Sequence, residues 1–185
     1  MIYRYELKIP HERLAVLIGK DGTVKKHIED ITSAKVDVDS KEGDITISGE
    51  DAIGLYNARE LILAIGRGFN PKLAEELIKG DYIFDQIYMK DYAKSRAMEL
   101  RLKGRVIGEE GKSRNLIEEL TDAHVSVYGK TIAFIGLPDN VAIARKAVEL
   151  LLKGSNHSTV YRWLERQRKE LKRKEIIGMT QRRDG

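Results

Sequence analysis

The N-terminal third of the chain contains apolar positions whose spacing changes along the sequence, and each spacing predicts an element. Residues 3–9 alternate between apolar and polar side chains, which predicts a strand that Pro10 ends. Residues 11–18 and 23–32 carry apolar side chains three and four positions apart, which predicts two short amphipathic helices. In the second of these helices, the inward stripe consists of Val24, Ile28 and Ile31.

Two further strands and a longer helix follow. Residues 35–38 and 45–49 alternate again, and the polar segment 40–44 between them predicts a turn. Residues 51–65 return to helical spacing, and the Gly66-Arg67-Gly68 segment ends this helix. We expect its buried side to consist of Ile53, Tyr56, Ala58, Leu61, Ile62 and Ile65. The predicted order of elements is therefore β-α-α-β-β-α.

The same order returns in the second half of the chain. Val106–Gly111 matches Leu17–Gly22 at a shift of 89 residues, which places Gly108 on Gly19. At the same shift the following residues coincide in pairs: Ile28 with Ile117, Thr32 with Thr121, Ala34 with Ala123, Val36 with Val125, and Val38 with Val127. A shorter hairpin then brings a second set of apolar residues opposite the first. A repeat of this length implies two copies of one domain.

The repeat predicts how the chain is divided. We place copy 1 at residues 1–68, a helical connector at 69–81, copy 2 at 82–154 and a basic helical tail at 155–185. The connector begins at Asn70-Pro71, a favourable helix start, and its apolar content predicts that the two copies pack together in tandem.

The tail has apolar side chains at helical spacing and basic side chains on its other faces. We expect Ser158 or Thr159 to cap the helix, and disorder from Gly178 onward. Two interpretations of the tail stay open. It either binds phosphates through its basic side chains or forms a solvated helix that is docked by Trp163.

Two glycine turns carry the clearest candidate chemistry: turn 1, Gly19-Lys20-Asp21-Gly22, and turn 2, Gly108-Glu109-Glu110-Gly111. Glycine permits positive φ and leaves no Cβ to block a close ligand. A helix begins just beyond each turn, so backbone N–H groups and the positive end of the helix dipole face it. Turn 1 also carries the positive charge of Lys20. These features predict a binding site for a phosphodiester backbone.

Composition and charge narrow the class of protein. The net charge is +4, but residues 155–185 contain nine lysines and arginines against four acidic residues, so the remainder is close to neutral. Any nucleic-acid site in the two copies must therefore be a local basic patch. The sequence contains no cysteine, which excludes disulfides and thiol chemistry. No apolar run approaches the length of a membrane span and the N-terminus does not resemble a signal peptide, so we expect a cytoplasmic protein without membrane contact.

An enzyme is not expected, and neither is a cofactor or a metal. The four histidines, at positions 11, 27, 124 and 157, are scattered without metal-ligand spacing. No phosphate-binding GxxxxGK[ST] motif is present, and no cluster of carboxylates is typical of a nuclease.

The segments Ile18–Ile28 and Thr32–Val38 closely resemble the core of the KH (K-homology) RNA-binding domain, and the resemblance covers both copies. It implies an α+β fold with two type I KH domains, each a three-stranded sheet backed by three helices. In such domains the GxxG turn and its flanking helices clamp about four nucleotides of a single strand.

The resemblance also implies roles for individual residues of copy 1. Gly19 and Gly22 would let the RNA backbone approach, with Lys20 pairing a phosphate beside Asp21. The residues expected to flank the groove, or to offer apolar surface to bases, are Arg13, Lys25, Lys26, Ile18 and Val36. A solvated helix face for Lys25 and Lys26, and plain core for Ile18 and Val36, are the alternative interpretations.

Copy 2 departs from the usual pattern because Glu109 and Glu110 would repel a phosphate at short range. Basic residues near the turn could outweigh them, since residues 95–114 contain six basic and three acidic side chains. The matching candidate set is Arg105, Ile107, Gly108, Glu109, Glu110, Gly111, Lys112, Arg114 and Val125. The alternative is that copy 2 contacts protein.

The two-KH layout and the segment Gly154–Tyr161 resemble a narrower family, the archaeal relatives of the eukaryotic "partner of Nob one" factor of ribosomal RNA processing. That resemblance implies binding to the 3′ end of small-subunit ribosomal RNA during ribosome biogenesis, beside a maturation endonuclease. It also implies contact with the alpha subunit of translation initiation factor two. Three alternatives stay open: an adaptor whose copy 1 holds RNA while copy 2 docks a protein, a non-ribosomal RNA chaperone, and a DNA-binding KH protein.

Overall fold

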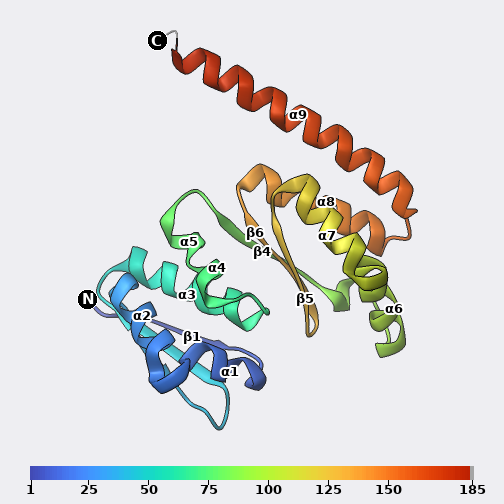
Figure 1. The fold of residues 1–185 in the computed structure, drawn as a ribbon. Helices are drawn as coiled ribbons and strands as arrows, with labels where there is room; N and C mark the ends of the chain where they lie inside the picture. The colour runs from blue at the N-terminus through green and yellow to red at the C-terminus, as the bar shows by residue number, and fades with distance from the viewer. Residues whose placement is uncertain (184–185) are drawn as a thin grey trace. The chain divides into compact units, whose positions relative to one another are not determined.

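The computed structural model describes the backbone of residues 1–183 and side chains through Met179. The chain divides into two compact units, unit 1 (Met1–Phe84) and unit 2 (Asp85–Gly185), and each is described by itself. Both contain the predicted β-α-α-β-β-α order, and the α+β class with two type I KH folds is confirmed. Figure 1 shows the elements of both units.

Unit 1 begins with strand β1 (Tyr3–Lys8), helix α1 (His11–Ile18), a 3-10 turn (Lys20–Gly22) and helix α2 (Thr23–Thr32). Strands β2 (Lys35–Val38) and β3 (Asp44–Gly49) follow, and helix α3 (Ala52–Gly66) completes the fold. The sheet is antiparallel in the order β1-β3-β2, so β2 is an edge strand.

The core of unit 1 corrects part of the expected burial on α3. Leu61, Ile62 and Ile65 are fully buried as predicted, but Ile53 is 72% exposed and Tyr56 is 53% exposed. Leu55 takes the inward position instead. The reason is helical spacing: Leu55 lies three residues before Ala58 and seven before Ile62, so it shares their buried face, whereas Ile53 and Tyr56 point away from it. Asp51 caps the helix by accepting hydrogen bonds from the N–H groups of residues 53 and 54.

The connector segment lies within unit 1 and packs against α3. It forms two short helices, α4 (Pro71–Ala74) and α5 (Glu76–Lys79), rather than one. Asn70 begins α4 as predicted, because its Oδ1 accepts a hydrogen bond of 2.8 Å from the N–H of Lys72. Glu75, between the helices, lies 3.0 Å from Nε2 of His27 on α2.

Unit 2 repeats the fold with strand β4 (Ile83–Tyr88), a 3-10 turn (Met89–Asp91) and helix α6 (Arg96–Ile107). A 3-10 turn (Glu109–Gly111) leads into helix α7 (Lys112–Thr121). The remaining elements are β5 (His124–Tyr128), β6 (Thr131–Gly136), α8 (Pro138–Leu152) and α9 (His157–Arg183). The sheet order β4-β6-β5 again leaves the second strand at an edge, and every residue of the central strand β6 is buried.

The tail helix α9 is part of the core of unit 2. Val160 and Leu164 are fully buried in the same cluster as Val148 and Leu151 of α8, and α9 also packs against α7. Trp163 is only partly buried, so Val160 and Leu164 are the main docking residues.

Both ends of α9 differ from the sequence prediction. The helix begins at His157, and the N–H groups of Thr159 and Val160 donate to the carbonyl of Asn156, so the helix starts ahead of the predicted caps. It also continues past Gly178 to Arg183, where we expected disorder from Gly178. Residues 184 and 185 lie outside the described residues.

The docked tail leads to a stability prediction. Leu164→Ala removes a fully buried side chain, so we expect it to lower the free energy of unfolding of unit 2 by about 2–4 kcal/mol. Denaturant unfolding followed by the fluorescence of Trp163, the single tryptophan, measures this directly. Met179→Ala is the control, because Met179 is 67% exposed and its loss should leave the midpoint unchanged. Equal midpoints for both variants would contradict the docking.

Candidate nucleic-acid interface

The two glycine turns have nearly identical backbone shapes. Gly19 has φ 73° and ψ 176°, Asp21 has φ 55°, and Gly22 has φ 75°. The matching φ values of turn 2 are 74° at Gly108, 53° at Glu110 and 77° at Gly111. Each turn therefore reverses the chain between two helices through three left-handed residues, one of which is not glycine.

The first and second glycines of each turn serve different purposes. A Cβ on Gly19 would lie 2.5 Å from Cγ2 of Val24, and one on Gly108 would lie 2.7 Å from Cβ of Ser113. A Cβ on Gly22 would meet nothing within 4 Å. The first glycine is thus required for close packing of the turn on the following helix. The second permits positive φ at a point that is open to a ligand.

The charged side chains of the turns are exposed. Lys20 and Asp21 project from turn 1, and Glu109 and Glu110 project from turn 2. Lys112 partly offsets the acidic pair, with its Nζ 3.8 Å from the Oε2 of Glu110. No side chain caps α2 or α7, so the dipole of each helix adds positive potential at its turn. Turn 1 therefore suits a phosphate better than turn 2 does.

Arg13, which was predicted to flank the groove, has a structural role in unit 1. Its Nε donates to the carbonyl of Ile65 and its Nη2 to that of Phe69, both at 2.8 Å, which satisfies carbonyls at the end of α3. In unit 2, Arg105 does the same for α8, with hydrogen bonds to the carbonyls of Leu151 and Ser155.

These two arginines do not coincide in the repeat. At the 89-residue shift Arg13 falls on Leu102, and Arg105 falls on Val16. The two positions lie one helical turn apart on the same face of the first helix, so both reach the end of the third helix. Arg105 additionally lines the cavity beside turn 2 that is described below.

Lys25 and Lys26 differ in availability. The Nζ of Lys25 lies 3.4 Å from Oε1 of Glu29, and that carboxylate also accepts a hydrogen bond of 2.7 Å from the N–H of Val36. Lys26 is exposed. Unit 2 repeats the contact between helix and strand, because Glu118 accepts a 2.7 Å hydrogen bond from the N–H of Val125.

The apolar candidates for base contact are partly corrected. Val36 is 0% exposed and Val125 is 3% exposed, so both are core residues and offer no surface to a base. The alternation of β2 and β5 points these side chains toward the helices. Ile18 and Ile107 are half-buried beside the turns and keep some exposed apolar surface. Arg114, also half-buried, donates from Nη2 to the Oδ1 of Asn115.

A cavity of about 480 Å³ lies beside turn 2 and includes the start of the tail helix. Gly108, Glu109 and Lys112 line it together with Arg101, Gly104 and Arg105 of α6, Ser113 of α7, and His157 and Tyr161 of α9. Ser113 is 1% exposed, and its Oγ is buried without a hydrogen-bond partner among the described residues.

The two α9 residues form a fixed wall of this cavity. The rings of His157 and Tyr161 meet edge to face with centroids 5.9 Å apart, and Nε2 of His157 lies 2.8 Å from the carbonyl of Arg105. A carbonyl only accepts, so Nε2 carries the proton. Sequence reasoning missed this pair. Their spacing of four on a helix was a signal that they share a face, but not that the face meets turn 2.

Two further kinds of site are absent from the described residues: a metal-binding cluster and a membrane-spanning helix. These residues contain no group of three or more His, Cys, Asp or Glu side chains that could hold a metal ion. None of the helices in the described part of the chain has the length and apolarity needed to cross a bilayer.

Both units match KH-domain models. Residues 4–64 match the KH domain, and residues 83–169 match the eukaryotic-type, type I KH domain that is the second one of PNO1. The second match extends over the first half of α9, in agreement with the docking of that helix on unit 2. The fold and the two turns thus define a tandem KH-domain protein.

Similar proteins narrow the family. The KH domain-containing protein MJ0443 of Methanocaldococcus jannaschii is 49% identical over 171 residues, covering 90% of this chain and 75% of the relative. The RNA-binding protein pno-1 of Caenorhabditis elegans is 31% identical over 62% of this chain, which spans 43% of that longer protein. The chain belongs to the PNO1/Dim2-like family of tandem KH-domain proteins.

Two solved structures share the architecture. Dim2p of Pyrococcus horikoshii, in a complex described as a/eIF2alpha-aDim2p-rRNA, is 43% identical with a TM-score of 0.85, covering 91% of this chain and 96% of that one. A protein of Aeropyrum pernix is 36% identical with a TM-score of 0.92, covering 98% of this chain and 99% of that one.

The glycine geometry predicts unequal effects within turn 1. Gly19→Ala places a side chain in a backbone region that is nearly exclusive to glycine, which costs about 1–3 kcal/mol. The new Cβ also clashes with Val24, so the total loss of stability of unit 1 should exceed that cost. Gly22→Ala meets no neighbour and should cost only about 1–2 kcal/mol for left-handed φ. Urea unfolding monitored by circular dichroism compares the two. A larger loss for Gly22→Ala would contradict the assignment of the packing role to Gly19.

Proposed function

We propose that this protein binds single-stranded RNA at its two glycine turns, and that its target is the 3′ end of small-subunit ribosomal RNA during ribosome maturation. The observation that carries the proposal is the duplicated turn, with the same three left-handed residues in front of an uncapped helix in both units. Backbone N–H groups and helix dipoles attract phosphates irrespective of sequence.

The relatives support the RNA target. The solved Dim2p complex contains rRNA, and a relative in Chaetomium thermophilum is named pre-rRNA-processing protein PNO1. The role proposed here is binding and not catalysis, so cleavage in such a pathway would belong to a partner endonuclease. The alpha subunit of translation initiation factor two is a second proposed partner, because the same complex contains a/eIF2alpha.

In this proposal the two turns bind phosphate by different means. Turn 1 uses Lys20 and the start of α2. Turn 2 carries an acidic pair, so the cations of its cavity must outweigh both Glu109 and Glu110. These cations are Arg101, Lys112 and the partly engaged Arg105. The buried Oγ of Ser113 and the wall formed by His157 and Tyr161 give this site groups that could contact a sugar or base.

An adaptor is the second candidate function. The acidic side chains of turn 2 favour it, because Glu109 and Glu110 repel phosphates but attract basic protein surfaces. In that case unit 1 holds RNA and unit 2 docks a protein.

A charge exchange between matching positions tests both candidates. Glu109 corresponds to Lys20 in the repeat, so Lys20→Glu and Glu109→Lys are reciprocal changes. Lys20→Glu should weaken binding of a single-stranded 3′-end oligonucleotide by about tenfold, since it replaces a charge-assisted hydrogen bond with repulsion. Glu109→Lys should strengthen binding by a similar factor. Fluorescence anisotropy at fixed salt measures both.

The controls separate local contact from overall charge. Lys146→Glu and Asp139→Lys make the same changes in charge at exposed positions of α8, outside the glycine turns and the tail. If Glu109→Lys has the same effect as Asp139→Lys, turn 2 does not bind RNA and the adaptor is favoured. If the native protein shows no preference over scrambled RNA, the ribosomal target is wrong.

A further inference from the structure

Unit 2 contains a second, larger cavity that none of the predicted site residues lines. It has a volume of about 550 Å³ and lies where three segments meet: the turn after β4, the start of α6, and the hairpin between β5 and β6. Its basic residues are Lys90, Lys94, Arg96, Lys103 and Lys130, and its single acidic residue is Glu99. Turn 2 lies beyond the opposite end of α6, because this cavity surrounds the start of that helix.

The backbone around this cavity is firmly held. The N–H of the fully buried Met89 donates to the carbonyl of Lys130 at 2.9 Å, which ties the turn after β4 to the hairpin. The N–H of Ala93 donates back to the carbonyl of Met89 at 2.8 Å. Ser95 caps α6 by accepting from the N–H of Met98. The basic side chains therefore extend from fixed positions.

Most of the positive charge is uncompensated. Glu99 pairs with Lys103 at 2.7 Å, but Lys94, Arg96 and Lys130 form no ion pair with any described residue. The hydrogen bond from Lys103 lowers the pKa of Glu99, and the nearby charges of Lys130 and Arg96 add to this effect. Four exposed cations thus surround a hollow with one internal ion pair.

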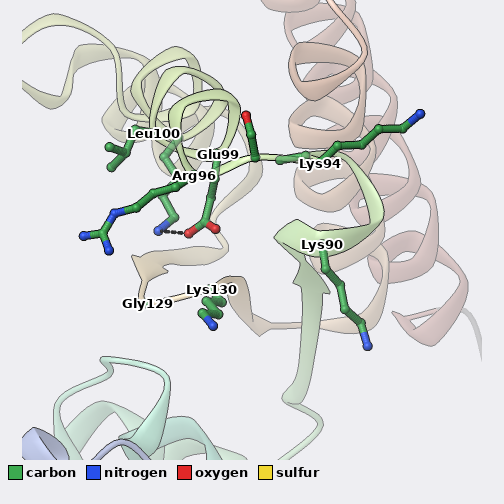
Figure 2. A pocket seen from close by; sticks show the side chains of 10 residues that line it. Lys90, Lys94, Arg96, Glu99, Leu100, Gly129 and Lys130 are labelled. Atoms are coloured by element: carbon green, nitrogen blue, oxygen red, sulfur yellow. Dashed lines mark ion pairs between the residues drawn. The ribbon is translucent and has the colours of Figure 1, made fainter.

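Figure 2 shows that these cations do not converge on one point. Arg96 extends to one side of the hollow, Lys94 and Lys90 extend to the other, and Lys130 comes from the hairpin below Glu99. A single small anion would need donors that point at one position. Cations spaced around a rim instead match a polymer with a charge on each repeating unit, such as a nucleic-acid strand.

The corresponding end of unit 1 has the opposite charge. Its hairpin between β2 and β3 carries Asp39, Glu42 and Asp44 against Lys41, and α1 has Glu12 in its first turn. The charge along the first helix therefore differs between the units. Unit 1 has one lysine and one aspartate at its glycine turn and is acidic at its hairpin, whereas unit 2 is acidic at its turn and basic at its hairpin.

We propose that this basic cavity of unit 2 is an additional RNA-phosphate site, which extends the strand held at turn 2 along α6. The inference rests on the proposed function. Helix α6 has 12 residues and is therefore about 18 Å long, so one strand must span several nucleotides to reach both ends. The cavity supplies the attraction that the acidic turn lacks, and the turn and Ile107 position the strand.

The test compares RNA lengths in a variant of the basic cavity. Lys94→Glu, Arg96→Glu and Lys130→Glu are combined, and the control combines Lys72→Glu, Lys146→Glu and Lys153→Glu, which are exposed and lie outside both cavities, the hairpins and the glycine turns. Each protein is titrated with oligonucleotides of about four nucleotides, the length one KH clamp holds, and of about twelve. Circular dichroism and Trp163 fluorescence verify that the variants are folded.

We expect the cavity variant to bind the short RNA as the control does and to bind the long RNA at least about tenfold more weakly. Loss of three phosphate contacts should also reduce the slope of log K against log salt by about 2 for the long RNA. Equal binding of the long RNA by the variant and the control would overturn the site. Each protein is also titrated with polyglutamate. If the cavity variant loses binding to polyglutamate but keeps its binding to the long RNA, the cavity binds an acidic protein and the proposed RNA site is wrong. If native protein binds neither RNA, the proposed function fails as well.

Discussion

The left-handed glycine turn between the first two helices is the constraint on which each unit depends. Gly19 and Gly108 adopt a conformation that other residues rarely enter, and each lies directly against the next helix. This contact fixes the angle between the helices, so the start of the second helix always faces the open side of the turn. The packing of the two helices and the exposed surface of the turn therefore depend on the same backbone geometry. This holds whichever side chains occupy the two positions between the glycines of the turn.

The two turns share one backbone shape, so they differ in the side chains they carry and in the elements that surround them. Unit 1 presents Lys20 at the turn, while unit 2 presents Glu109 and surrounds it with a cavity that α9 helps to build. The arginines that satisfy the last helix show the same freedom, since Arg13 and Arg105 do one task from positions a helical turn apart. The two copies thus have the same fold but carry different charged side chains at matching positions.

The predictable part of the structure is the part that depends on local spacing. Alternation and helical periodicity, confirmed by the repeat, were sufficient for the order of strands and helices and for both turns. Burial of single side chains was harder to predict: Ile53 and Tyr56 are apolar enough to be taken for core residues, yet only Leu55 lies on the face shared by Ala58 and Ile62. The engagement of Arg13 and the wall formed by His157 and Tyr161 depend on contacts between distant segments. No local pattern encodes such contacts.

The carboxylate of Glu29 affects whether a strand of another molecule can pair with the edge of the sheet. Strand β2 is an edge of its sheet, and an edge strand presents unpaired N–H groups to which another strand can add. Glu29 occupies the N–H of Val36, and Glu118 occupies that of Val125 on the edge strand β5. An incoming strand would have to displace a charged hydrogen bond at the second residue of each edge strand. The same glutamate in both units thus disfavours strand addition at one edge of each sheet, the edge formed by β2 or β5.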